Sequence, residues 1–468
     1  MKTTFAPAGA HVHFLGICGT AMGAVAAAMS ARGFKVTGQD DNVYPPMSDY
    51  LAGRGIVITR GFAADAVPAA DFVVVGNAMT RGNPAVEAVL NRRMLYFSLP
   101  ETLRLFFLRG RHNLVVAGTH GKTTTTSMLA WIFESAGRAP GWLIGGIPAN
   151  LGDGANLRDS DYFILEGDEY DTAFFDKRSK FLHYLPELVA INNVEFDHAD
   201  IYHNLDEIKT TFRRLVAVVP SEGMVLVNAD DPAAVEVAST AMAPLVEVGF
   251  SPNAANRITS AHTGPDGSSF ELMGRRFDIA MHGDFNIRNA AMAASAAHFY
   301  GITPDEIQRA LASFQGVKRR QEIRGTAGGV TVIDDFGHHP TAIAATLAGL
   351  RARYPHARLW AVFEPRSNTT RRNIFQNQLP AAFAGADGVF LSKVARLEQI
   401  PPEQRLDPEK VVRDLAATGK IAGYEPDAAA IVGRVCEVAA AGDVVVVFSN
   451  GGFDGIHSKL LAALEGRS

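Results

Sequence analysis

The sequence contains very little cysteine: Cys18 and Cys436 are the only two among 468 residues. Two cysteines so far apart cannot build a disulfide framework, and their spacing is not that of metal ligands. We expect both to be small buried side chains. The chain also lacks an apolar run long enough to span a bilayer, and its N-terminus lacks the apolar stretch of a signal peptide. We therefore expect a cytoplasmic protein with no membrane partner.

A strong charge of one sign is absent as well. Lysine and arginine number 44 against 49 aspartate and glutamate, which gives a net charge of -5. Such a balance provides no general attraction for nucleic acid, so we expect no nucleic-acid partner. Any phosphate site must be local, and the composition implies no particular oligomeric state.

The length of the chain suggests about three domains. Short β-rich runs alternate with helical runs along the whole sequence, which is the pattern of mainly parallel sheets covered by helices. We predict three α/β domains at residues 1–110, 111–322 and 323–468. The stretch 251–283 has turn signals between short alternating runs, and it predicts an antiparallel hairpin inserted in the α/β pattern.

One motif points to phosphate binding. Residues 115–126 read VVAGTHGKTTTT, an apolar strand followed by two glycines, a lysine and threonines. Gly118 and Gly121 allow a close approach of the backbone to an oxyanion, and the helix that follows offers unpaired N–H groups. Lys122 would contact the outer phosphates and Thr123 would contact Mg²⁺. The full phosphate-loop pattern has Gly where this chain has Val116, so the match is to a shortened variant.

Two other strand ends carry groups that can bind a metal ion. The first is FILEGDEYD, with Glu166, Asp168, Glu169 and Asp171; the second is LVAINNVEFDHAD, with Asn193, Glu195, Asp197 and His198. Oxygen and imidazole ligands at strand ends facing a phosphate loop are typical of Mg²⁺ with a triphosphate. The alternative is that the acids cap helices and the histidine is a satisfied polar group.

A second glycine-rich turn lies near the N-terminus, in HFLGICGTAMG. Gly16, Gly19 and Gly23 follow a strand and open a helix, so they indicate either a nucleotide cradle or tight packing. Their spacing is not the G-x-G-x-x-G of dinucleotide sites. Asp40, at the end of the next strand, would meet a ribose or cap the following turn.

Together these stretches resemble the Mur ligases, ATP-dependent amide-forming enzymes of bacterial cell-wall synthesis. The resemblance is carried by GTHGKTTT, EGDEYD, NNVEFDHAD, GDFNIRNAAMAA, FQGVKRRQEIRG and DDFGHHPTA, in the order of the family. Further stretches are similar to the branch that recycles cell-wall peptides: NVYPPMS, GNAMTRGNPAVEAVL, FFDKRSKFLHY, EPRSNT and SNGGFDGIHSKLL. The resemblance implies a Rossmann-like N-terminal domain, a P-loop ATPase-like central domain and a Rossmann-like C-terminal domain.

The resemblance also implies an activity. It is the ligation of UDP-N-acetylmuramate to the murein tripeptide L-alanyl-γ-D-glutamyl-meso-diaminopimelate, through an acyl phosphate, with ATP and Mg²⁺ as cofactors. The N-terminal domain would hold the UDP-sugar, the central domain ATP and Mg²⁺, and the C-terminal domain would close over the nucleotide and the peptide.

Site residues follow from the same resemblance. The expected ATP-binding residues are Gly118, Thr119, His120, Gly121, Lys122, Thr123, Thr124, Asn289, Arg319 and Arg320. Thr123, Glu166 and His198 would bind metal. The UDP-sugar would lie against Gly16, Gly19, Gly23, Asp40 and Asn77, and the peptide carboxylates against Arg366 and Asn368. The expected catalytic residues are Lys122, Glu166, His198, Asp335 and His338, with His339 as another possible base.

Three positions depart from the family pattern. Gly167 stands where Ala is usual, Phe285 where His is common, and Asp454 where Gly is usual. The last change matters only if the backbone there has a positive φ.

Three rival functions remain open. They are a ligase that adds free L-alanine to the same sugar, an NAD-dependent oxidoreductase built on HFLGICGT, and a catalytically dead nucleotide sensor.

Overall fold

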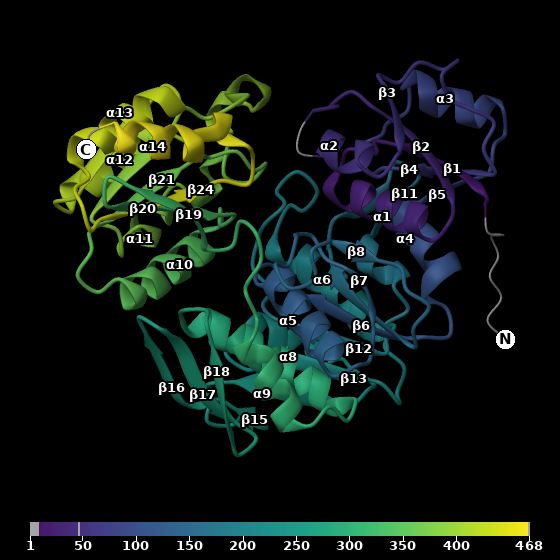
Figure 1. Ribbon diagram of the computed structural model, residues 1–468, viewed down its shortest axis with the longest axis horizontal. Helices are drawn as coiled ribbons and strands as arrows, with labels where there is room; N and C mark the ends of the chain where they lie inside the picture. The colour runs from purple at the N-terminus through teal and green to yellow at the C-terminus, as the bar shows by residue number, and fades with distance from the viewer. Residues whose placement is uncertain (1–8, 45–46, 467–468) are drawn as a thin grey trace. The chain divides into compact units, whose positions relative to one another are not determined.

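The computed structural model describes residues 9–44 and 47–466 (Figure 1). Its contacts divide the chain into two units. The first unit contains the chain up to Glu195, together with Asn204–Ile258 and Asn289–Phe314. The second contains Phe196–His203, Thr259–Arg288 and the chain from Gln315 onward. Two α/β sheets lie in the first unit and one in the second, so the fold is α/β with mainly parallel strands, as predicted.

The N-terminal sheet has five parallel strands in the order β3-β2-β1-β4-β5. They are β1 (His11–Leu15), β2 (Lys35–Asp40), β3 (Val57–Arg60), β4 (Phe72–Val75) and β5 (Tyr96–Ser98). Its helices are α1 (Thr20–Ala31), α2 (Met47–Ala52), α3 (Pro84–Asn91) and α4 (Leu99–Leu103), followed by a π-helical turn, η1 (Arg104–Leu108). Helix α3 begins at Pro84, because Asn83 caps it and proline suits the first helical position.

The central sheet has eight strands in the order β15-β14-β13-β12-β6-β9-β7-β8, and only the β7–β8 pair is antiparallel. The strands are β6 (His112–Ala117), β7 (Gly141–Leu143), β8 (Ala155–Asn156), β9 (Tyr162–Gly167), β12 (Leu188–Ile191), β13 (Met224–Asn228), β14 (Leu245–Gly249) and β15 (Asn256–Arg257). The helices in this part of the chain are α5 (Lys122–Ser135), α6 (Leu205–Ala217), α7 (Pro232–Ala238), α8 (Asp284–Phe299) and α9 (Pro304–Ala312). The central strands β6, β9 and β12 are nearly continuous apolar runs, as expected where helices cover both faces.

Two small antiparallel sheets interrupt this pattern. Strands β10 (Asp171–Ala173) and β11 (Asp176–Ser179) form a hairpin, followed by a 3₁₀ turn, η2 (Lys180–His183). Strands β16 (Thr259–Gly264), β17 (Gly267–Leu272) and β18 (Arg275–Ile279) form the other sheet. The antiparallel prediction for 251–283 is thus confirmed, although the antiparallel sheet has three strands, because a second turn at Met273 and Gly274, both with positive φ, adds one. Strand β15, in the same segment, pairs with the central sheet instead.

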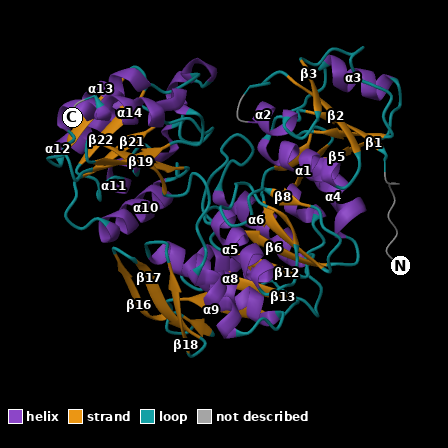
Figure 2. Cartoon of the chain, viewed as in Figure 1, coloured by secondary structure: helices purple, strands orange, loops and turns teal. Residues whose placement is uncertain are grey.

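The sheet of the second unit has six strands in the order β19-β20-β24-β21-β22-β23, parallel except for the β19–β20 pair. The strands are β19 (Glu322–Ala327), β20 (Val330–Asp335), β21 (Leu359–Phe363), β22 (Gly388–Ser392), β23 (Ile421–Glu425) and β24 (Val444–Phe448). The helices are α10 (Pro340–Arg353), α11 (Leu379–Ala382), α12 (Pro408–Ala417), α13 (Ala428–Val438) and α14 (Ile456–Glu465). Figure 2 shows these helices around the strands of the sheet.

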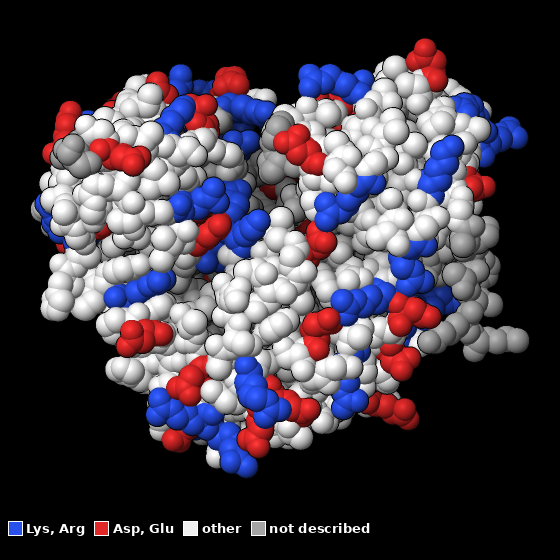
Figure 3. Space-filling model, viewed as in Figure 1, with Lys and Arg blue, Asp and Glu red and all other residues white. Residues whose placement is uncertain are grey.

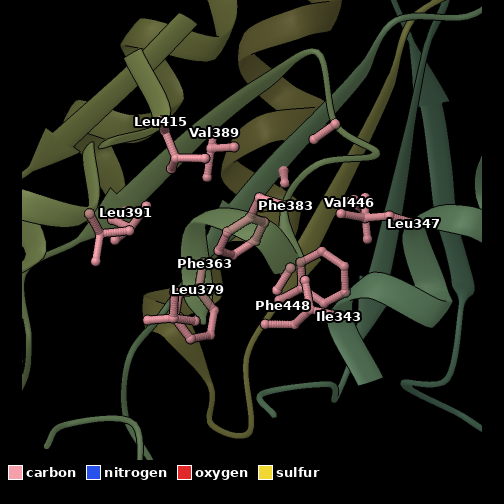
Figure 4. Close-up of a cluster of buried hydrophobic side chains, with 14 of the residues drawn as sticks. Ile343, Leu347, Phe363, Leu379, Phe383, Val389, Leu391, Leu415, Val446 and Phe448 are labelled. Atoms are coloured by element: carbon pink, nitrogen blue, oxygen red, sulfur yellow. The ribbon is translucent and has the colours of Figure 1, made fainter. Parts of the chain in front are cut away.

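Alternate residues of these strands enter different cores. Along β24, Val444, Val446 and Phe448 belong to one buried cluster, and Val445 and Val447 belong to another. This is the two-residue period of a strand whose faces are both covered. In the first cluster the ring centroids of Phe363 and Phe383 lie 5.6 Å apart (Figure 4).

The surface agrees with the balanced composition. Figure 3 shows acidic and basic side chains interspersed over the face in view. Among the described residues, no helix has both the length and the apolar character needed to cross a bilayer.

The two cysteines are less buried than expected: Cys18 and Cys436 are free thiols of intermediate burial. Burial raises the pKa of Cys18 to about 11, so this thiol stays protonated at neutral pH.

Candidate functional site

The GTHGKT loop connects β6 to α5 in the first unit. Gly118 and Gly121 have φ of 138° and 77°, which favour glycine. A Cβ on Gly121 would lie 2.6 Å from Asn289 Oδ1, so the turn is tightly packed as well. Gly121 is the N-cap residue of α5 and makes no side-chain cap, which leaves the first N–H groups of the helix directed at the loop.

Lys122 is held inside this loop. Its Nζ donates to the carbonyl oxygen of Gly118 at 2.6 Å and to the two carboxylate oxygens of Glu169 at 2.8 and 3.1 Å. Both side chains are largely covered, with 13% and 2% exposure. Burial lowers the pKa of Lys122, but Glu169 and the neighbouring acids outweigh it and the pKa is raised. The amine is therefore a fixed ammonium ion where a phosphate would enter.

Thr123 and Glu166, the two residues expected to bind the first metal ion, are in direct contact. The Thr123 hydroxyl donates to Glu166 Oε1 at 2.9 Å, and the backbone N–H of Gly145 donates to Glu166 Oε2 at 2.6 Å. A hydroxyl and a carboxylate at the end of a phosphate loop form the hard-oxygen donor set that Mg²⁺ prefers. The residues present therefore fit this metal.

Asparagines at the end of β12 shape the other side of the loop. The Asn193 side chain accepts the backbone N–H of His120 at 2.7 Å, and the Asn193 carbonyl accepts that of Thr119 at 3.1 Å. Asn192 donates to Thr125, and Thr125 donates to Asn289 Oδ1 at 3.1 Å. Asn192, Thr125 and Gly145 were not predicted. A run of polar residues after the apolar strand LVAI is the signal that could have identified Asn192.

The other acids after β9 bind lysines of the same segment. Lys180 Nζ lies 2.6 Å from Asp168 Oδ2, and Lys177 Nζ lies 2.6 Å from Asp171 Oδ2. Of that cluster, Glu166 and Glu169 thus contact the phosphate-loop residues. Gly167 lies between them with no room for alanine, since a Cβ would be 2.8 Å from Val115 Cγ1.

The N-terminal glycine turn is built differently. Gly16 has φ of 85°, and the Asp40 carboxylate accepts the backbone N–H groups of Cys18 at 2.9 Å and Asn42 at 2.8 Å. Asp40 therefore caps the turns on both sides of it. A Cβ on Gly23 would lie 2.4 Å from the Met47 sulfur, so Gly23 makes room for α2. Gly19 precedes α1 as its N-cap residue.

The predicted residues of the C-terminal domain gather where β20 ends in the second unit. Asp335 accepts backbone N–H groups of Gln321 at 2.9 Å and Gly337 at 2.7 Å, and burial raises its pKa. The Arg319 side chain donates to the carbonyls of Ser449 and Gly451, both at 2.7 Å. The Arg320 guanidinium lies 4.7 Å from the Phe336 ring centre.

His198 and its neighbour Asp197 also belong to the second unit. His198 has a positive φ of 55°. Asp197 Oδ1 accepts the Thr369 hydroxyl at 2.6 Å, and Asp197 Oδ2 lies 3.4 Å from His338 Nε2. Burial raises the pKa of Asp197, but its contacts with His338 and Thr369 hold it well below its usual range. An ionised Asp197 therefore links His338 and Thr369 to the segment that carries His198.

The remaining predicted side chains differ in burial, and His339 is only 3% exposed. His339 caps α10, and its Nε2 lies 3.3 Å from the carbonyl of Phe196. Arg366 is about half exposed, 3.6 Å from Glu364. Asn77 is exposed in the first unit.

Asp454 has φ of 50°, so the departure from glycine at this position does fall on a left-handed residue. Phe285 is of intermediate burial, and its ring lies 3.0 Å from where a Cβ on Gly283 would be.

Comparisons with known proteins identify the family. Residues 11–111 match the catalytic domain of the Mur ligase family, 116–297 the Mur ligase middle domain, and 319–451 the Mur ligase glutamate ligase domain. The chain belongs to the Mur ligase family. It is an ATP-dependent ligase that forms an amide bond, and this excludes the oxidoreductase alternative.

Individual relatives match the chain over nearly its full length. The chain is 44% identical, over 97% of its length and 98% of the relative, to UDP-N-acetylmuramate–L-alanyl-γ-D-glutamyl-meso-2,6-diaminoheptandioate ligase of Escherichia coli. It is 32% identical, over 96% of its length and 94% of the relative, to UDP-N-acetylmuramate–L-alanine ligase of Variovorax paradoxus. A solved murein peptide ligase from Psychrobacter arcticus has 36% identity and a TM-score of 0.74, covering 98% of this chain and 99% of that one.

Proposed function

We propose that this enzyme joins UDP-N-acetylmuramate to L-alanyl-γ-D-glutamyl-meso-diaminopimelate in murein recycling. The single observation that carries the proposal is 44% identity over 97% of the chain to a ligase of that name. In this proposal residues 1–110 hold the UDP-sugar, residues 111–322 hold ATP and Mg²⁺, and residues 323–468 close on the nucleotide and the peptide. Both ATP and the UDP-sugar are cytoplasmic metabolites, so the reaction is assigned to the cytoplasm.

The chemistry requires activation of a poor electrophile. The lactyl carboxylate of the sugar attacks the γ-phosphorus of ATP, ADP leaves, and an acyl phosphate forms. The amine of the peptide's alanine then attacks the acyl carbon, and phosphate leaves as the amide forms. Because an anion attacks an anionic centre in the first step, fixed positive charge supplies much of the catalysis. Lys122 and the N-terminus of α5 provide it here.

Thr123 and Glu166 would hold one Mg²⁺, and His198 is the expected ligand of a second. Mg²⁺ bound there would screen the phosphate charge and orient the oxygens. The support from this chain is the contact of Thr123 with Glu166, and the backbone N–H of Gly145 that fixes the second carboxylate oxygen.

The attacking amine must lose a proton. Both carboxylate oxygens of Asp335 already accept backbone N–H groups, so its role is to hold the turn before His338. His338 is the proposed proton acceptor. Asp197, 3.4 Å from His338 Nε2, would stabilise the protonated ring.

The nearest rival is a ligase for free L-alanine, which the 32% identical relatives favour. Incubation of the pure enzyme with ATP, Mg²⁺ and UDP-N-acetylmuramate, with either tripeptide or L-alanine, separates the two. We expect phosphate release with the tripeptide and none above background with alanine. Release with alanine alone would overturn the recycling assignment.

A further inference from the structure

A cluster of arginines in the second unit has no role in the chemistry described so far. It consists of Arg371, Arg372 and Arg396, and we call it the arginine cluster. Two chain segments bring it together. The Arg371 carbonyl accepts the backbone N–H of Leu406 at 3.1 Å, and Arg372 forms an isolated antiparallel bridge with Arg405.

The guanidinium of Arg371 has a fixed direction. Its Nη2 donates to Asn368 Oδ1 at 2.6 Å, and its Nη1 donates to the carbonyl of Arg396 at 3.4 Å. Asn368, expected to meet the peptide, therefore orients this arginine. A guanidinium that is already oriented loses less freedom when a carboxylate binds.

The positive charge of the cluster is only partly offset by nearby acids, Asp200 and Glu398. Within the part of the chain that the structure describes, none of the three arginines forms an ion pair, and the Nε atoms of Arg371 and Arg372 are buried without an acceptor. Burial lowers the pKa of Arg371, and the charges of Arg396 and Arg372 lower it further. Asp200 and Glu398 act in the opposite direction without reversing the shift. Like charges held together with spare donors are destabilising by themselves, and a bound anion relieves that cost.

Arg366 is different, although it is only five positions away. It has a carboxylate at 3.6 Å, that of Glu364, and it lies against Gly451 beyond the end of β24. Arg366 therefore lies beyond the carboxyl ends of the inner strands β21 and β24, and it is not part of the arginine cluster.

The proposed peptide substrate offers what such a cluster would bind. Its γ-linked glutamate keeps a free α-carboxylate, and diaminopimelate has a carboxylate at each of its two centres. Free L-alanine has a single carboxylate, next to the amine that reacts. Resting on the proposed function, we propose that the arginine cluster binds the carboxylates of the distal residues of the peptide, and so selects a tripeptide over a single amino acid.

The test compares two peptides and three variants. The KM of wild type, Arg371→Gln and Arg396→Gln is measured for the tripeptide and for the same tripeptide with both diaminopimelate carboxylates amidated. Arg413→Gln is the matched control, since Arg413 is an exposed arginine of the same unit, 3.6 Å from Asp407. Arg371→Lys keeps the charge and loses the two oriented donors.

We expect KM for the tripeptide to rise about 10-fold in each glutamine variant, with little change in kcat. KM for the amidated peptide should already be high in wild type and should stay the same in the variants. Arg371→Lys should recover part of the preference for the tripeptide over the amidated peptide that Arg371→Gln loses. Arg413→Gln should leave that preference as it is in wild type.

A cluster that only supports the loops would change both peptides equally, and that result would overturn the inference. Arg396 is exposed, so its variant remains informative if Arg371→Gln does not fold. Failure of the proposed function is read separately, from the absence of tripeptide ligation in wild type.

Discussion

The first unit contains the same local motif twice, a strand, a glycine turn and a helix, and the two copies are used differently. In the turn after β6, glycines make room for Asn192, Asn193 and Asn289 and surround a buried ammonium ion. In the turn after β1, Gly23 makes room for Met47, and the Asp40 carboxylate accepts the backbone N–H of Cys18. The backbone pattern sets a possible phosphate cradle, and the charge placed in it decides whether phosphate chemistry takes place.

The largest expected effect comes from removing that charge. Lys122→Ala should lower ligation about 1000-fold, because the γ-phosphate loses a fixed cation during transfer. Phosphate release measures the loss of ligation. The control is Lys35→Ala, at the exposed lysine that begins β2. Because the change leaves Glu169 buried without its partner, Lys122→Ala with Glu169→Gln should regain thermal stability but no activity. If Lys122→Ala turned over substrate about as fast as wild type, the GTHGKT loop would not be catalytic.

The next effect tests the packing of the second turn. Gly121→Ala places a Cβ 2.6 Å from Asn289 Oδ1 at a φ of 77°. Left-handed strain and the clash together should cost about 2–4 kcal/mol, with loss of ATP binding. Urea unfolding and nucleotide titration measure the two effects. A stable variant with unchanged ATP affinity would contradict the close approach of loop and asparagine.

Lowering the pH should reduce the stability of the fold around β1, because His13 is buried there. Burial lowers the pKa of His13, on β1, from 6.5 to about 4. The unfolded chain therefore binds a proton between these values while the native state does not, so stability falls as pH falls from about 6.5 to 4, by about 3 kcal/mol. Hydrogen exchange of β1 amides at matched pH should show this loss in wild type and less of it in His13→Gln. The exposed His356 is the control, and its glutamine variant should behave as wild type.

The smallest effect concerns Gly16. Its φ is 85°, but the nearest atom to an added Cβ is the Met79 methyl at 3.5 Å. Gly16→Ala should therefore cost only the left-handed conformation, about 1 kcal/mol. The difference in urea midpoint between Gly16→Ala and Gly121→Ala measures how much tighter the second turn is. Equal losses would mean that the two turns are packed alike.

Much of the local structure could be predicted from the sequence. The alternation of short β-rich and helical runs predicts the α/β pattern that forms, and helix α3 begins at Pro84 because its Asn83 cap acts over a few residues. Helix α2 and strand β5 were missed because they are short, and their burial depends on the rest of the domain. The partners of Lys122 could not be foreseen either. Four acids lie within six residues at the end of β9, and only folding decides which one reaches the lysine.

The amino-acid sequence by itself determined the family, the α/β class and the loop that receives phosphate, because these depend on residue types at fixed short spacings. Only the tertiary structure decided that Glu169 holds Lys122, that Asp40 and Met47 fill the first turn, and that the arginine cluster forms without a carboxylate partner. These contacts join residues distant along the chain. Their geometry depends on how strands and turns pack, and no local pattern encodes it.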